Sequence, residues 1–247
     1  MKTFKLTIEY DGTDFNGWQV QTNAPRTVQG EIEKVLSKIF KKHIAVVGSG
    51  RTDTGVHARG QVAHFRAVTA MPADEIQRAM NYNLPFDIVI LKVEEAEKDF
   101  HAQLDACWKT YSYTILNRSC SSALNHRYCC FFPRRLDFAL MRKEAKALVG
   151  EKDFRSFANI DRSRPGRNAI RTIRALSIRK RGDFIVLTIE ADGFLYKMVR
   201  NIVGTLIEIA SGRFPAGSVK AMLQRKDRRA AGLAAPPQGL CLEKVDY

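Results

Sequence analysis

The hydrophobic period of this sequence switches repeatedly between two and about 3.6 residues, which restricts the chain to folds that combine sheets with helices. Every second residue is apolar in 3–10, as in a half-buried strand. Thr27 can cap an amphipathic helix that extends to Phe40. The rest of the first half predicts strands over 61–66 and 87–93, a helix over 71–82, and a short strand near Ala45.

A similar order of elements recurs in the second half. The pattern predicts a strand over 108–117, a helix capped by Asp137, a hairpin that turns at Gly182-Asp183, an apolar helix over 195–210 and a short final strand. The chain therefore predicts an α+β fold of two pseudo-repeated ferredoxin-like (RRM-like) halves, residues 1–105 and 106–247. We expect their antiparallel sheets to meet at a central cleft, with the helices on the outer face.

The net charge of +14 is spread unevenly over the 247 residues. Residues 1–105 hold 13 Lys and Arg against 14 Asp and Glu, whereas residues 106–247 hold 27 against 12. A half this basic suits a polyanion, and nucleic acid is the usual one. The chain shows no apolar run that could span a membrane and no secretion signal. Its five cysteines, an odd number without a CxxC pair, favour a reducing, cytoplasmic setting.

The stretch GSGRTDTGVHARGQVAHF, residues 48–65, gathers glycines around a single carboxylate, that of Asp53. Glycines adopt backbone angles closed to other residues and let another molecule approach closely. The residues alone leave two interpretations open: a turn in which Asp53 binds its own backbone amides, or a loop that presents a catalytic acid. His57 and His64 lack the spacing of a metal-ligand pair, so we expect no metal site. The sequence has no P-loop or GxGxxG motif, so we expect no nucleotide cofactor.

The segment GRTDTGVHA followed by QVAHF resembles the catalytic-aspartate signature of the tRNA pseudouridine synthase A family. Further blocks that resemble this family are YDGTDFNGWQVQ with TVQG, KTYSYTI, FLYKMVR and GLCLEKVDY. They spread over nearly the whole chain, although residues 118–135 align with none of them. The resemblance implies an isomerase that flips out a uridine and converts it to pseudouridine. Its substrate would be the anticodon arm of tRNA, at positions 38–40. The enzyme would act as a homodimer and without a cofactor.

The resemblance also implies roles for particular side chains. Asp53 would be the catalytic nucleophile, Tyr111 would stack on the target uracil, and Arg200 would pair with the catalytic carboxylate and keep it ionised. Their structural alternatives are a packed strand tyrosine and a solvated helix arginine. Phosphate contacts are expected from arginines near the catalytic loop and in the second half: Arg51, Arg59, Arg162, Arg164, Arg167 and Arg171. The competing function is a non-catalytic RNA-binding module.

Overall fold

The computed structural model describes residues 1–161, 166 and 168–247, so the predicted phosphate contacts at Arg162, Arg164 and Arg167 lie outside the described residues. The chain forms two compact units, one of residues 1–107 with 241–247 and one of residues 108–240. The boundary predicted between the two halves lies at 105/106, with the last strand in the second half. In the structure, residues 241–247 group with the first unit, where Cys241 and Leu242 pair in parallel with the start of β3.

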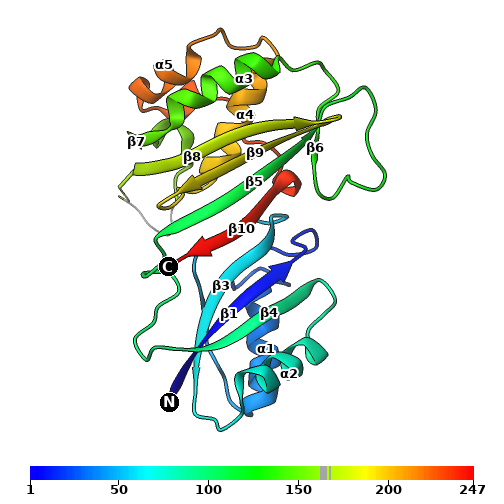
Figure 1. Ribbon diagram of the computed structural model, residues 1–247, viewed down its shortest axis with the longest axis vertical. Coiled ribbons are helices and arrows are strands. Elements are labelled where there is room, and N and C mark those ends of the chain that lie inside the picture. Colours follow the sequence, from blue (N-terminus) through cyan, green and yellow to red (C-terminus); the bar gives the residue numbers. More distant parts are fainter. Residues whose placement is uncertain (162–165, 167) are drawn as a thin grey trace. The chain divides into compact units, whose positions relative to one another are not determined.

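The first unit is a sheet with two helices. Its elements are β1 (Lys2–Tyr10), α1 (Val28–Phe40), β2 (Val46–Gly48), β3 (His57–Ala67), α2 (Ala73–Asn83), β4 (Ile88–Ala96) and the end of β10 (Leu240–Asp246). Strand β1 lies between β3 and β4 and pairs antiparallel with both, and β2 pairs antiparallel with β3 (Figure 1). The alternation predicted for β1 is confirmed, because Phe4, Leu6 and Ile8 are at most 1% exposed.

The helices of the first unit begin where their sequences predict, with one difference. Thr27 caps α1, since its hydroxyl accepts a hydrogen bond of 3.2 Å from the Gly30 amide. The sequence predicts a helix over 71–82, which would place Pro72 in its first turn. Pro72 instead precedes α2 as the N-cap residue, with an extended backbone.

The second unit is an antiparallel sheet in the order β5-β9-β8-β7, packed against helices. Its strands are β5 (Trp108–Leu116), β6 (Cys130–Phe131), β7 (Gly150–Asp153), β8 (Ile170–Arg181) and β9 (Phe184–Ala191). Its helices are α3 (Phe138–Ala145), α4 (Met198–Ala210) and α5 (Ser218–Arg225), with 3-10 turns at Lys146–Leu148, Arg155–Phe157, Arg228–Ala230 and Pro237–Gly239. The hairpin at Gly182 is confirmed, and Gly182 has the φ of 56° that such a turn favours.

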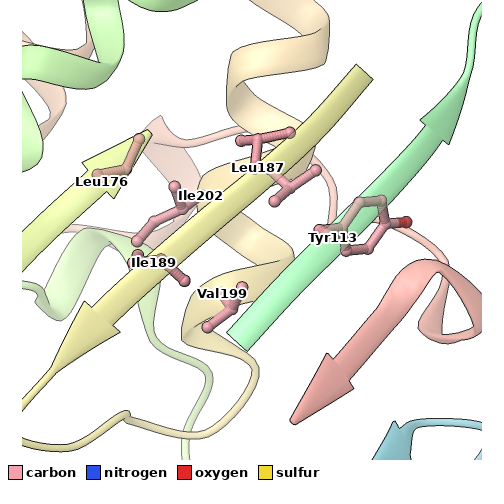
Figure 2. Close-up of a pocket in the computed structure, with 7 residues that line it drawn as sticks. Tyr113, Leu176, Leu187, Ile189, Val199 and Ile202 are labelled. Carbon is pink, nitrogen blue, oxygen red and sulfur yellow. The ribbon is translucent and has the colours of Figure 1, made fainter. Parts of the chain in front are cut away.

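Helix α4 forms the centre of the second unit's core. Its residues Val199 and Ile202 face Leu187 and Ile189 of β9 and Tyr113 of β5 (Figure 2). The space left between these side chains measures about 10 Å³, far below the several hundred Å³ of a ligand pocket. This interior is therefore packing core. Among the residues that the structure describes, no helix is long and apolar enough to cross a membrane.

Candidate active site

Asp53 lies in the loop between β2 and β3, and strand β3 holds the first part of that loop. The Ser49 amide donates to the Val62 carbonyl at 2.7 Å, and its hydroxyl donates to Gln61 Oε1 at 2.8 Å. The Gln61 side chain also donates to the Gly50 carbonyl at 3.1 Å. Gln61 and Ser49 are both fully buried, so these bonds are shielded from water.

The residues next to Asp53 are held from a second direction. The Trp18 amide donates to the Thr52 carbonyl at 3.1 Å, and the Tyr10 and Thr52 hydroxyls share a hydrogen bond of 2.8 Å. Behind the acid, the Val56 amide donates to the Asp53 carbonyl at 3.1 Å. Thr52 and Val56 are buried, whereas Asp53 is half-buried. The loop is thus fixed on both sides of a carboxyl group that stays partly accessible.

Gly12 and Gly17 lie so close to neighbouring backbone that a larger residue would not fit at either position. Gly17 has a φ of 83°, and a Cβ built there would lie 2.6 Å from the Thr52 carbonyl oxygen. A Cβ at Gly12 would lie 2.0 Å from the Val56 carbonyl oxygen. Residues 12–18 therefore lie directly against the loop that carries Asp53. The block YDGTDFNGWQVQ carried the signal, because its glycines surround the residues that make this contact.

Arg26, which packs on Phe15 of this segment, forms an ion pair with Asp87, the residue just before β4. The Arg26 guanidinium binds the Asp87 carboxylate through two hydrogen bonds, of 2.8 and 2.9 Å, and lies 4.1 Å from the centre of the Phe15 ring. The Asp87 carboxylate raises the pKa of Arg26. Phe15 and Trp18 are each 1% exposed, so both aromatic side chains belong to the packed interior. Sequence reasoning missed the ion pair, because its partners are 61 positions apart.

The two histidines of residues 48–65 each accept a hydrogen bond from a backbone amide. His57 Nδ1 accepts from the Gly12 amide at 3.1 Å, and His64 Nδ1 accepts from the Ala102 amide at 3.1 Å. Burial lowers the pKa of His64 to about 4, and the nearby His101 acts in the same direction. Within the described ranges, no group of three or more His, Cys, Asp or Glu side chains is arranged to hold a metal ion.

Tyr111 and Arg200 belong to the second unit, and Asp53 belongs to the first. Tyr111 on β5 is 8% exposed and meets the Phe194 ring edge to face, with centroids 5.1 Å apart. Arg200 on α4 is half-buried. Its Nε donates to the Ala235 carbonyl at 2.7 Å. The second tyrosine of KTYSYTI, Tyr113, is fully buried and donates to the Pro236 carbonyl at 2.7 Å.

The described members of the predicted phosphate-binding arginines differ in their surroundings. Arg51 is exposed beside the catalytic loop. Arg59 on β3 binds Glu243 at 3.0 Å, although its side chain is 68% exposed. Arg171 donates to the carbonyl oxygens of Asn168, at 3.0 Å, and Ile170, and burial lowers its pKa.

Comparisons of this sequence with known proteins show the family to which the chain belongs. The family model described as tRNA pseudouridine synthase matches residues 6–105 and 145–247. The tRNA pseudouridine synthase A 2 of Clostridium perfringens is 42% identical to this chain over 250 residues, covering 100% of both chains. The tRNA pseudouridine synthases A of Thermoanaerobacter sp. and Brevibacillus brevis are 42% and 43% identical over 247 residues, again with 100% coverage of both chains. This chain therefore belongs to the tRNA pseudouridine synthase family.

Proposed function

We propose that this chain isomerises uridine to pseudouridine in the anticodon arm of tRNA, at positions 38–40, with Asp53 as the catalytic nucleophile. The reaction moves uracil from an N1 to a C5 attachment on one ribose, with no redox change and no group lost. It requires a carboxylate, a surface for the freed base, and a basic track for phosphates. Flipping the nucleotide out of its stack costs a few kcal/mol, which RNA contacts must offset.

The observation that carries this proposal is the way the loop holds Asp53. Two backbone carbonyls just before Asp53, at Gly50 and Thr52, accept hydrogen bonds from the rest of the first unit. The Asp53 carbonyl accepts a third, from the Val56 amide. A fixed nucleophile needs little reorganisation when the base arrives, and such positioning accounts for several kcal/mol of many enzymatic accelerations.

Tyr111 and Arg200 are proposed to act on the same nucleoside as Asp53. Phe194 sets the orientation of the Tyr111 ring, so the ring can serve as a rigid platform for the freed uracil. The Nε bond to Ala235 orients the Arg200 guanidinium, whose positive charge would keep the Asp53 carboxylate ionised. Along the RNA, phosphate contacts would come from the arginines that the sequence predicts for this role: Arg51, Arg59, Arg162, Arg164, Arg167 and Arg171.

We further infer that the two halves share one plan and divide the work. The first runs β1, α1, β2, β3, α2, β4. The second runs β5, α3, β8, β9, α4 and then β10, with the short elements β6, β7 and α5 inserted among them. This repeated order supports two ferredoxin-like halves. Residues 1–105 would supply the catalytic loop, and the basic residues 106–247 would bind most of the RNA. The enzyme would act in the cytoplasm as a homodimer, without a cofactor.

The test is release of tritium from tRNA labelled at uracil C5, with EDTA present and no cofactor added. We expect release by the wild-type protein and none by Asp53→Asn, while both bind tRNA equally. Asp99→Asn makes the same chemical change on an exposed residue and is expected to keep full activity. Turnover by Asp53→Asn would remove Asp53 as the nucleophile.

The same assay separates a synthase from a non-catalytic RNA-binding module. A binding module would retain tRNA on a filter and release no tritium, even with the wild-type sequence. Tyr111→Ala and Arg200→Ala are expected to bind tRNA and to lose most of their turnover with the fold intact. Mapping the product should place pseudouridine at positions 38–40, and a product elsewhere in the tRNA would refute that part of the proposal.

A further inference from the structure

The segment that joins β5 to α3, residues 117–136, is strongly basic and is here called the β5–α3 excursion. It contains no Asp or Glu and four arginines, Arg118, Arg127, Arg134 and Arg135. The family model leaves residues 106–144 unmatched, so the excursion lies outside the pattern that identifies the family. None of its residues has a role in the site described above.

The base of the excursion is closed by backbone pairing. Strand β6 runs parallel to the end of β5, with Cys130 opposite Ile115 and Phe131 opposite Leu116 (Figure 1). The Asn117 side-chain amide donates to the carbonyls of Phe132, at 2.9 Å, and Arg134, at 2.7 Å. The excursion is thus an ordered projection from the strand that carries Tyr111.

The arginines of the excursion fall into two groups. Arg118 is structural, because it donates to the carbonyls of Cys120, at 2.9 Å, and Ser121, at 2.8 Å, and lies 3.5 Å from Asp183. Arg127, Arg134 and Arg135 are exposed. Large apolar side chains are exposed among them: Leu124 at 88%, Tyr128 at 50% and Phe131 at 38%. Exposed cations interleaved with an exposed aromatic ring suit single-stranded RNA, which offers phosphates and unstacked bases together.

We propose that the β5–α3 excursion is a separate RNA-binding surface for the tRNA substrate, with Arg134 and Arg135 on phosphates and Tyr128 stacked on an unpaired base. An RNA partner is favoured over a second copy of the chain by charge. A two-fold contact in which one excursion meets the other would bring their arginines together, and neither excursion carries a carboxylate to offset the repulsion. The inference rests on the tRNA substrate of the proposed function.

The position of the excursion on β5 defines which part of the RNA it can reach. Leu116, the last residue of β5 before the excursion, is five positions after Tyr111, and strands rise about 3.3 Å per residue. The excursion therefore starts about 17 Å along the strand from Tyr111. If Tyr111 holds the target base, the excursion contacts nucleotides that flank it, and it contributes to binding without touching the reacting atoms.

The test is the salt dependence of tRNA binding by the double variant Arg134→Ala/Arg135→Ala. Each lost phosphate contact should reduce the slope of log K against log salt by about 0.7–0.9, so the double variant should lose about 1.5. At moderate salt we expect roughly tenfold weaker binding, with kcat at saturating tRNA unchanged. Arg134→Lys/Arg135→Lys should restore most of the slope. Binding is measured directly, so this result does not depend on whether Asp53 is the nucleophile.

The matched control is Lys220→Ala/Arg225→Ala, which removes two exposed cations from α5 in the same unit. The control is expected to keep the wild-type slope within about half a unit. Tyr128→Ala should weaken binding by about 5- to 100-fold without changing the slope, and Tyr128→Phe should bind as the wild type.

Two results would overturn the inference. One is a slope of log K against log salt that is the same in the Arg134→Ala/Arg135→Ala variant as in the wild type, or that falls by the same amount in the α5 control. The other is a shift of the excursion variant to smaller assemblies by sedimentation, with its RNA slope intact, which would assign the surface to protein contacts instead.

Discussion

Replacing Gly17 by alanine should disable the enzyme more than it destabilises the fold. Gly17 has a φ of 83°, and an L-residue in the left-handed region costs about 1–2 kcal/mol. The added Cβ would lie 2.6 Å from the Thr52 carbonyl oxygen, where ordinary contacts begin at 3.4 Å. The chain segments must therefore separate by about 0.8 Å, the difference of those two distances. A displacement of about 1 Å at a catalytic group can cost about 100-fold in rate.

The assay compares Gly17→Ala with Gly212→Ala. Gly212 has the same φ of 83° but has open space where a Cβ would be placed. Both variants carry the cost of the left-handed φ, and Gly17→Ala adds the cost of the clash, so its Tm should fall further than that of Gly212→Ala, by about 2–4 °C for each additional kcal/mol in a chain of this size. Only Gly17→Ala should lose about 100-fold in kcat for tritium release, because only Gly17 touches the catalytic loop. Equal turnover by the two folded variants would refute the idea that residues 12–18 position Asp53.

Two further predictions concern the first unit. Arg26→Met leaves the Asp87 carboxylate, whose side chain is 6% exposed, without its partner. Urea unfolding should show that the free energy of unfolding falls by about 3 kcal/mol. Arg26→Lys keeps the charge but loses the two-pronged guanidinium contact, and it should lose less than half of that free energy. The fold lowers the pKa of His64 from an ordinary 6.5 to about 4. As the pH drops, the unfolded chain therefore takes up a proton at this residue before the folded chain does. The free energy of unfolding should fall between pH 6.5 and pH 4. His64→Asn keeps an acceptor for the Ala102 amide and should flatten Tm across that window; an unchanged slope would mean that another group titrates there.

Local periodicity was enough to predict most elements, because each pattern is set by neighbours in the sequence. The strand over 108–117 is β5, and the cap at Asp137 is confirmed by a hydrogen bond of 2.9 Å from the Leu140 amide. Boundaries were less accurate. The helix expected over 195–210 begins only at Met198, because Lys197 has a left-handed φ of 58°. Short elements such as α5 and β7 were not predicted, since they are stabilised by packing rather than by a strong pattern of their own.

The amino-acid sequence by itself determined the alternation of strands and helices, the basic second half, and the glycine-rich stretch around Asp53 whose blocks indicate the family. The tertiary structure decided what holds that stretch in place. Tyr10 reaches Thr52 across 42 positions, and Arg26 reaches Asp87 across 61. Such contacts depend on strand register and on the packing of one loop against another, which no local propensity encodes. Candidate residues can therefore be read from a motif, while the geometry that positions them comes from distant parts of the chain.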